Sequence, residues 1–422
     1  MAADADRCHH RNVSAPPPAS TLPHPLRALR ARDFRVYFAG QLVSVAGTWM
    51  QQIAMAWLAY KLTNSALVLG VLGFASQIPI LLFAPLGGVW SDRVDRRRLM
   101  MTTQALAMLQ ALVLALLAWQ GWATPALLIG LAFVLGCINA VDVPARQSLV
   151  VHLVADRALL PNAIALNSFM MNSTRFVGPA LAGVIVAWAG EAVCFLLNAL
   201  SYLAVLVALA ALHVRPGGGA VKPALHALME GLAYTVSHRD IRLFLLLVAA
   251  VSFFVAPYVV MLPLYAKTVL GGDARTFGLL VSSAGAGSLV ASVFLASHRS
   301  IEHLARRVGR AAILAGVAVV AFALNDVAAL AYPILMLLGF SVVLVAAGVN
   351  TLLQSWVRDD MRGRVMSIFS MAFLGIAPLG HLAMGSLTHA VGIRPALVVF
   401  GVFAVGAGLW HRRRLGRVGV GG

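Results

Sequence analysis

The chain has 422 residues, of which 60% are hydrophobic and only 11% are charged, and its mean hydropathy is +0.87. This composition excludes a soluble enzyme with a conventional core, a disordered chain and a nucleic-acid-binding domain, even though the net charge is +17. Three cysteines cannot form a disulfide framework. Because a membrane-spanning helix needs roughly 20 apolar residues, the composition indicates an integral membrane protein with about twelve spans.

Apolar runs without charge follow one another along the chain, and each is long enough to cross a bilayer as a helix. Residues 1–26 precede the first run and are predicted to be a flexible tail without a secretory signal. The fold class is therefore an all-α membrane protein. In chain order, we predict spans near residues 36–60, 66–90, 99–119, 125–143, 164–188, 192–212, 241–266, 276–297, 311–328, 331–355, 365–389 and 394–410.

The lysine and arginine residues are distributed unevenly between the connections. Twenty-seven of the 32 fall in the two tails and in every second connection, four fall in the other connections, and Arg175 remains inside a span. Since positively charged connections stay on the cytoplasmic side, both termini are predicted to be cytoplasmic in a multi-pass protein of the cell (inner) membrane. The basic excess then serves membrane orientation, and the expected partner is the lipid bilayer, not a nucleic acid.

The longest polar break divides the predicted spans into six plus six. Local sequence recurs between the halves: Gln147 leaves span four as Gln354 leaves span ten, and Pro179 of span five parallels Pro378 of span eleven. Such matches indicate a duplicated six-helix unit, with chance similarity of short apolar strings as the alternative. The predicted parts are a tail at 1–26, an N-terminal bundle at 27–212, a cytoplasmic central loop at 213–240, a C-terminal bundle at 241–411 and a basic cytoplasmic tail at 412–422.

The connection after the second span carries the most specific string of the chain, Gly88-Val-Trp-Ser-Asp92-Arg93-Val-Asp95-Arg96-Arg97-Arg98. A glycine lets two helices approach closely at the membrane edge, and Asp92 can accept hydrogen bonds from a helix N-terminus or an arginine. For the arginines at the end of the string, the alternative is a simple cytoplasmic anchor.

This string resembles the loop signature of the major facilitator superfamily, in which Gly, three residues, Asp, Arg, one residue and Gly precede two basic residues. Asp95 stands in the place of the second glycine, a departure typical of the secretion-effector branch that includes the enterobactin exporter. Further strings similar to that branch begin at Asp142, Asn162 and Arg362. The resemblance covers about residues 27–412 and implies two pseudo-symmetric six-helix bundles that move a substrate by alternating access.

The resemblance also implies a cytoplasmic gate. Asp92 would contact the start of span eleven in the outward-open state, and further charged residues would complete the cluster. The gating residues implied in this way are Gly88, Asp92, Arg93, Arg96, Asp142, Arg146, Arg362 and Arg364.

Arg175 lies about eleven residues into its span, which places it roughly 16 Å deep and near the middle of the bilayer. A bare arginine there costs roughly 2.5–3.5 kcal/mol, so its side chain is expected to face a cavity or a partner. It could recognise an anionic substrate or form an ion pair that breaks during transport. The structural alternative is hydrogen bonding to helix-end carbonyls or to Asn172.

Two residues are candidates for carrying a coupling proton. His381 lies in span eleven and belongs to the residue type that titrates near physiological pH, whereas Asp142 is the competing site at the end of span four. For His381 the alternative is a hydrogen-bonded histidine inside the bundle. Gly178, Pro179 and Gly183 resemble, incompletely, the antiporter motif of span five, and their alternative is a kinked and closely packed helix.

In the superfamily, the first and fourth spans of each half line the cavity. Aromatic, methionine and amide groups on those spans suit a bulky amphipathic ligand. Besides Arg175, the candidate substrate-binding residues are Gln41, Thr48, Trp49, Gln52, Asn139, Tyr258 and Asn350.

These features predict a proton-coupled, secondary-active exporter of a bulky amphipathic or anionic small molecule, with a siderophore-like cargo first. Macrolide-like or multidrug efflux, nutrient uptake and a non-transporting scaffold or sensor remain alternatives. The sequence contains no P-loop, metal-ligand cluster or nucleophile–base arrangement. We therefore expect no cofactor, no metal and no enzyme activity, and a monomer.

Overall fold

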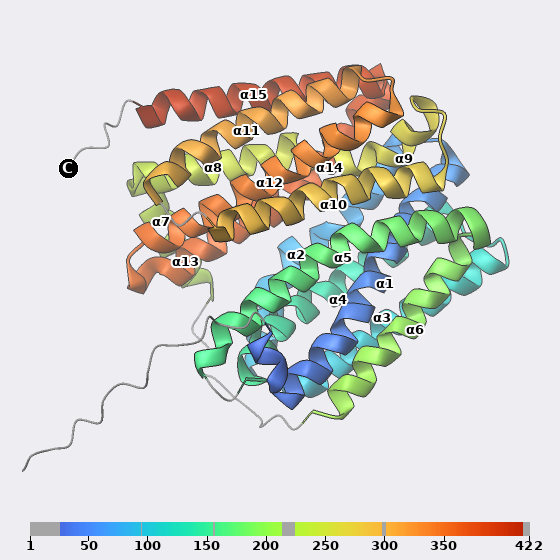
Figure 1. The fold of residues 1–422 in the computed structure, drawn as a ribbon, viewed down its shortest axis with the longest axis horizontal. Helices are drawn as coiled ribbons and strands as arrows, with labels where there is room; N and C mark the ends of the chain where they lie inside the picture. Colours follow the sequence, from blue (N-terminus) through green and yellow to red (C-terminus); the bar gives the residue numbers. More distant parts are fainter. Residues whose placement is uncertain (1–25, 94, 155–156, 213–223, 298–300, 417–422) are drawn as a thin grey trace, which may run out of the picture.

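Every regular element in the described part of the chain is a helix (Figure 1). The computed structural model describes residues 26–93, 95–154, 157–212, 224–297 and 301–416. Within these ranges, the side chains of residues 84–93, 96, 148, 151–152, 157, 224–228, 301–302 and 416 are not described. The predicted tail at 1–26, except for Leu26, and the part of the central loop at 213–223 lie outside the described residues.

Six long helices form the first half of the molecule, here called the N-half. They are α1 (Arg32–Thr63), α2 (Ala66–Arg93), α3 (Arg96–Trp119), α4 (Pro125–His152), α5 (Leu160–Ala189) and α6 (Glu191–Ala210), with short 3-10 turns η1 (Arg27–Arg30) and η2 (Arg157–Leu159).

The second half, here called the C-half, repeats this arrangement with two of its six long segments interrupted. Its helices are α7 (Ala224–Ser237), α8 (Arg239–Phe254), α9 (Tyr258–Thr268), α10 (Ala274–Ser297), α11 (Ile301–Leu324), α12 (Ala328–Trp356), α13 (Asp359–Ser370), the π-helical η3 (Met371–Gly375), α14 (Ala377–Val391) and α15 (Ile393–Gly416). Pro257 separates α8 from α9, because proline cannot donate the hydrogen bond that a continuing helix needs.

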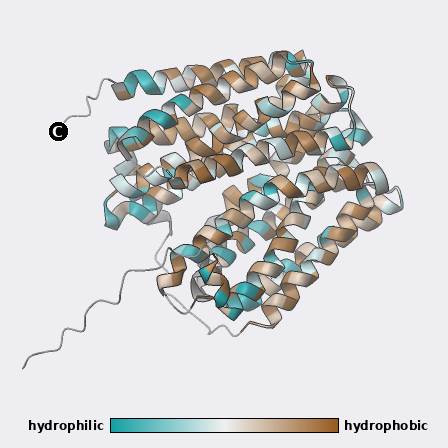
Figure 2. Ribbon diagram, in the orientation of Figure 1, coloured by the Kyte–Doolittle hydropathy of each residue, from teal (hydrophilic) through white to brown (hydrophobic). Residues whose placement is uncertain are grey.

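Eleven of the described segments are long and apolar enough to cross a membrane, and α1 is the twelfth crossing helix. Figure 2 shows the hydrophobic residues along the lengths of these helices. Polar side chains inside α1 hydrogen-bond within the N-half: Gln51 donates to Gln110 of α3 at 2.9 Å, and Asn198 of α6 donates to Gln51 at 2.7 Å. Because these buried amides satisfy one another, α1 stays a buried helix in spite of its polarity. The predicted all-α, twelve-helix fold is thus confirmed.

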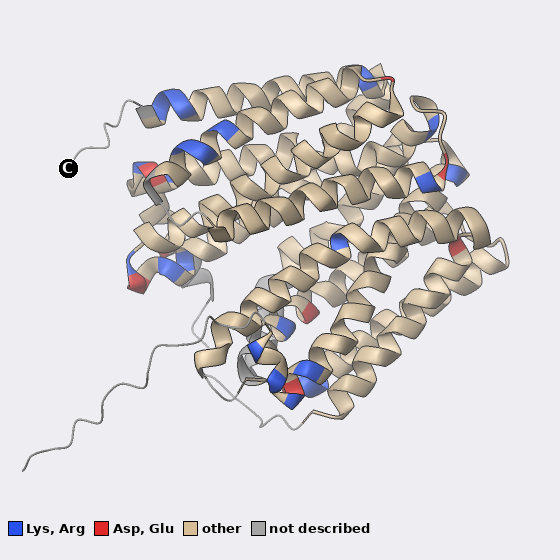
Figure 3. Ribbon diagram, in the orientation of Figure 1, with Lys and Arg blue, Asp and Glu red and all other residues tan. Residues whose placement is uncertain are grey.

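Charged residues collect at the two ends of the helices, and the middle is nearly free of them (Figure 3). One end, called here the arginine-rich end, carries Arg30 and Arg35 of the N-half and Arg310, Arg364 and Arg413 of the C-half, among others. The opposite end carries few charges, and four of them form two ion pairs: Lys61 with Glu191 at 3.2 Å, and Arg394 with Asp326.

The two halves meet along two helix crossings, α5 with α10 and α2 with α14. In both, glycines bring backbones together: a Cβ on Gly183 would lie 2.9 Å from the Ala274 carbonyl oxygen, and one on Gly70 would lie 2.8 Å from the Gly385 Cα. Both crossings include residues near the opposite end. Figure 1 shows the helices of the two halves diverging from there toward the arginine-rich end.

Candidate functional site

The centre of the candidate site is the turn of α5 around Arg175. Pro179 lacks an N–H, so the Arg175 carbonyl has no helical donor four residues ahead. A Cβ on Gly285 of α10 would lie only 2.6 Å from this carbonyl oxygen. Next to it, Ser282 donates a hydrogen bond to the Phe176 carbonyl at 2.7 Å. The backbone of Arg175 therefore lies directly at the crossing between the two halves.

The Arg175 side chain is exposed and lies over an aromatic ring of the N-half. Its guanidinium carbon lies 5.3 Å from the ring centroid of Trp49 on α1, and the buried Tyr258 of α9 is near enough to interact with it electrostatically. Such a cation–π contact is worth about 0.5–2 kcal/mol. Asn172 donates to the Ser168 carbonyl instead of meeting Arg175. Among the described residues, Arg175 has no hydrogen-bond or ion-pair partner, so its N–H groups are available to an anion.

The other predicted lining residues are placed differently. Gln41 is 1% exposed inside the N-half, and Thr48 donates to the Ser44 carbonyl at 2.9 Å on the face of α1 that contacts Tyr202. Gln52 is exposed and Asn139 is half-buried. Asn350 accepts a hydrogen bond from its own helix neighbour, Gln354. Of the predicted set, Trp49 and Tyr258 are the residues that these contacts bring to Arg175.

The predicted antiporter-like motif forms two contacts at once. A Cβ on Gly178 would lie 2.6 Å from Trp49 Cβ, which is the α1–α5 contact inside the N-half. The second contact joins α5 to Gly278 of α10 in the C-half. A Cβ on Gly278 would lie 2.5 Å from the Pro179 carbonyl oxygen, and Gly183 also faces Gly278. The motif therefore positions Arg175 by close packing on both sides.

His381 is buried in the second crossing between the halves. It is 4% exposed on α14, and a Cβ on Gly73 of α2 would lie 3.0 Å from its Nδ1. That nitrogen has no hydrogen-bond partner in the described part of the chain. Its contacts with Gly70 and Gly73 join His381 to α2, away from the Arg175 cluster.

Asp142 is a buried carboxylate that hydrogen bonds hold inside the N-half. It is 3% exposed, and one oxygen accepts hydrogen bonds from Thr103 and Gln104 of α3, both at 2.8 Å. Its other oxygen lies 3.6 Å from Arg146, one turn further along α4. Asp142 and Arg146, both predicted as members of the gating cluster, thus lie close together, and α3 adds two donors that the sequence did not indicate.

The side chains of Gly88, Asp92, Arg93 and Arg96, on which the predicted gate depends, lie outside the described part of the structure. The neighbouring residues explain how the connection turns. Asp95 begins α3 as its N-cap and accepts from the backbone N–H groups of Arg97 at 2.9 Å and Arg98 at 3.3 Å. Arg97 in turn donates to the last carbonyls of α6, at Leu209 and Ala210. These contacts stabilise the start of α3 and the end of α6.

In the C-half, the two predicted gating arginines have partners of their own. Arg362 forms an ion pair with Asp359 at 2.5 Å, and Arg364 forms one with Glu230 of α7 at 2.5 Å. The helix α7 occupies part of the predicted central loop and was not expected. Its signal was the run of helix-forming residues at 227–233, which was too short to stand out beside the membrane spans.

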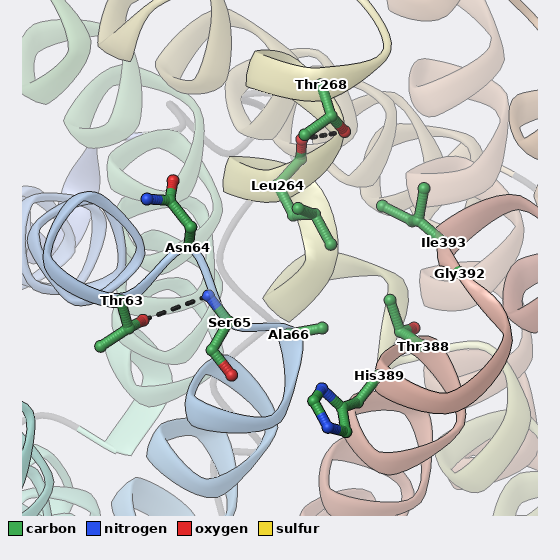
Figure 4. A pocket seen from close by; sticks show the side chains of 10 residues that line it. All are labelled: Thr63, Asn64, Ser65, Ala66, Leu264, Thr268, Thr388, His389, Gly392 and Ile393. Carbon is green, nitrogen blue, oxygen red and sulfur yellow. Dashed lines mark hydrogen bonds between the residues drawn. The ribbon is translucent and has the colours of Figure 1, made fainter.

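A surface depression of about 470 Å³ lies between the halves at the opposite end (Figure 4). Its lining comes from the α1–α2 connection and from α9, α14 and the start of α15, and none of these residues belongs to the Arg175 cluster. Hydroxyl groups there bond locally, as Thr63 does with the Ser65 N–H at 3.2 Å. The depression therefore marks the outer edge of the crossings and is separate from the candidate site.

Comparison with known proteins gives the family. Residues 23–418 match the family described as "Transmembrane secretion effector". The chain is 25% identical to the staphyloferrin A transporter of Staphylococcus aureus, over 88% of this chain and 93% of that one. It is 26% identical to the multidrug efflux pump Tap of Mycobacterium tuberculosis, over 90% and 92%.

A solved structure has the same fold. It is a bacterial homologue of the human lysosomal transporter Spinster in an inward-facing, unoccupied conformation, with a TM-score of 0.67 and 15% identity over 93% of this chain and 97% of that one. The family match spans nearly the whole chain, including all twelve crossing helices. The chain is thus a multi-pass membrane transporter, not an enzyme, and belongs to the transmembrane secretion effector family of the major facilitator superfamily.

Proposed function

We propose that this transporter exports a bulky amphipathic or anionic small molecule, with a siderophore-like cargo first, and that a proton gradient drives the export. The observation that carries the proposal is the position of Arg175 between the halves. A guanidinium that has no hydrogen-bonding partner among the described residues and lies over the Trp49 ring suits a ligand that combines negative charge with flat apolar groups. The relative named for staphyloferrin A supports this cargo class.

A second cargo class is favoured by the aromatic part of the same cluster. The ring of Trp49 can pack against an apolar drug without any anionic group, and a relative named as a multidrug efflux pump supports this alternative. The two classes differ in their need for Arg175. Binding of an anionic cargo depends on the charge of Arg175, whereas binding of a neutral drug depends mainly on aromatic packing.

We place the arginine-rich end on the cytoplasmic side, following the distribution of basic residues. The crossings near the opposite end then close the outer side, and the described arrangement corresponds to an inward-open state. In the outward-open state, Asp92 contacts Arg362 or Arg364. The arginine that it contacts leaves its present partner, which is Asp359 for Arg362 and Glu230 for Arg364. The side-chain contacts at the gate thus alternate with the state of the transporter.

For the coupling proton, we propose Asp142 before His381. Asp142 already has a charged neighbour and two hydrogen-bond donors, so a change in its protonation alters three contacts at the arginine-rich end. His381 lies in a crossing that must open during transport, which makes it the second candidate.

The test is transport into inverted membrane vesicles under an imposed proton gradient, with a catecholate siderophore and a neutral macrolide as cargoes. Arg175→Ala should reduce siderophore transport about 10- to 100-fold, the value of a lost charge-assisted hydrogen bond, and should leave the macrolide much less affected. Arg175→Lys should restore part of the activity. Asn172→Ala is the matched control, because Asn172 bonds only within α5.

Equal siderophore transport by Arg175→Ala and the wild type would contradict anion recognition. Transport unchanged by an uncoupler would contradict proton coupling. Flux in the reverse direction only would favour uptake, and purified protein in liposomes without flux of any cargo would favour a scaffold or sensor.

A further inference from the structure

The outward faces of two neighbouring helices change from apolar to basic at the same level. On α11, exposed residues recur with helical spacing and form one row along the helix. Leu314 and Val317 are the apolar part of this row, and Arg310 and Arg306 are its basic part. On α15, the corresponding row runs from Val402 and Leu409 into Arg413. A row of this kind faces lipid along its apolar part, so the arginines lie where that lipid has its head groups.

The two rows are adjacent. The helices α11 and α15 pack along their length, and a Cβ on Gly309 would lie 3.3 Å from the Arg412 side chain. Arg239 at the start of α8 reaches the Arg414 carbonyl at 3.5 Å, so a third helix adds basic groups to the same end. Figure 3 shows the basic turns of α11 and α15 near the ends of the two helices.

Aromatic side chains accompany these arginines. The Arg414 guanidinium lies 5.9 Å from the ring centroid of Trp410, and Arg307 lies 5.5 Å from that of Phe294 on α10. Trp410 is itself 41% exposed. Tryptophan beside basic residues is typical of the level at which lipid head groups meet acyl chains.

The structure gives the arginines of this cluster no anionic partner among the side chains that it describes, which do not include Glu302 of α11. Among the described residues, no carboxylate pairs with Arg306, Arg310, Arg412 or Arg413. The first turn of α8, next to this cluster, contains one acidic residue, Asp240. In the N-half, Arg97 caps α6 and Arg146 faces Asp142, whereas Arg30 and Arg35 are exposed but are not accompanied by the paired apolar rows of α11 and α15. Several like charges held together without counterions favour an external anion.

We propose that the cluster of Arg306, Arg310, Arg412 and Arg413 binds the head group of an anionic phospholipid, whose acyl chains lie along the apolar rows of α11 and α15. Arginine suits this ligand because its planar donors match phosphate oxygens in pairs. The site is specific to the C-half, and the proposal does not depend on the cargo or on the direction of transport.

The test is native mass spectrometry of the purified full chain titrated with phosphatidylglycerol or phosphatidylcholine. Since each arginine near a head group contributes about 1 kcal/mol, Arg310→Gln combined with Arg413→Gln should weaken phosphatidylglycerol binding about 30-fold, which corresponds to about 2 kcal/mol. The matched control is Arg30→Gln combined with Arg35→Gln. It removes two exposed charges from the same end of the N-half and should change binding less than 3-fold.

A loss of binding in the control equal to that in the C-half variant would overturn the proposal, because binding would then follow total charge alone. Equal retention of the two lipids by the wild type would overturn it as well. If the double variant does not fold, brominated lipids provide a test on the intact protein. The Trp410 signal is the part of the tryptophan fluorescence that Trp410→Phe removes. Brominated phosphatidylglycerol should quench this signal at a lower lipid fraction than brominated phosphatidylcholine does. Equal quenching by the two lipids would contradict the site.

Discussion

Replacing Gly285 with alanine adds one methyl group at the crossing of α5 and α10. That methyl carbon would lie 2.6 Å from the Arg175 carbonyl oxygen, 2.8 Å from Phe176 Cα and 2.9 Å from Arg175 C. All three are backbone atoms, so none can rotate away and the two helices must separate. Overpacking of this kind costs about 1–3 kcal/mol.

Because the added methyl group lies on α10 of the C-half and the three backbone atoms lie on α5 of the N-half, the cost falls on the state in which the crossing is formed. A penalty of about 1–3 kcal/mol shifts the balance between transporter states by roughly 5- to 150-fold. The matched control is Gly130→Ala on α4, where an added Cβ meets no atom within 4 Å. Alanine there should only gain helix propensity, up to about 1 kcal/mol.

The shift can be measured with a reporter thiol at the opposite end. Thr388 is 4% exposed there, so Thr388→Cys in a background without other cysteines should react slowly with a membrane-impermeant maleimide. Adding Gly285→Ala should raise the labelling rate several-fold or more, and adding Gly130→Ala should leave it unchanged. Equal labelling rates and equal melting temperatures for the two alanine variants would refute the argument that this contact holds the halves together.

Three further changes have defined outcomes. Asp142→Ala should lower the free energy of unfolding by about 3 kcal/mol, since buried donors and an arginine lose their acceptor; a thermal-shift change within error would contradict this. Glu191→Gln should cost at most about 1 kcal/mol, because its partner Lys61 is 62% exposed, and a larger loss would show a second role. Asp273 caps α10 by accepting from Thr276, and these hydrogen bonds lower the pKa of Asp273 below its usual 3.8. Its contribution of about 1 kcal/mol should be present above pH 4 and disappear as the pH falls through the lowered pKa, whereas Asp273→Ala should remove this acid sensitivity.

Apolar run length predicted the membrane helices well, because crossing a bilayer requires a fixed length of apolar helix. The span expected at 36–60 is α1 (Arg32–Thr63), and the one expected at 394–410 is α15, which continues to Gly416. The helix α7 and the interruption at Pro257 were not predicted. A single turn signal inside a long apolar run does not show whether the helix bends or stops.

For the site, the cost of a charge inside the membrane supplies a prediction about position. Arg175 had to face a cavity or a partner, and the structure places it at the crossing of the halves beside Trp49. The direction of neutral polar residues could not be read in the same way. Gln41 and Thr48 lie on α1 with Trp49, yet hydrogen bonding and packing turn them toward the N-half interior. Helical spacing shows which residues share a face, but not which partner that face meets.

The cap formed by Asp95 bears on how such chains are identified. The superfamily signature that the connection resembles has a glycine at this place, where backbone freedom would make the turn. Here a carboxylate achieves a turn by holding two N–H groups of α3. A search pattern that demands the glycine would reject this chain, so the pattern is better written for the geometry that either residue can provide.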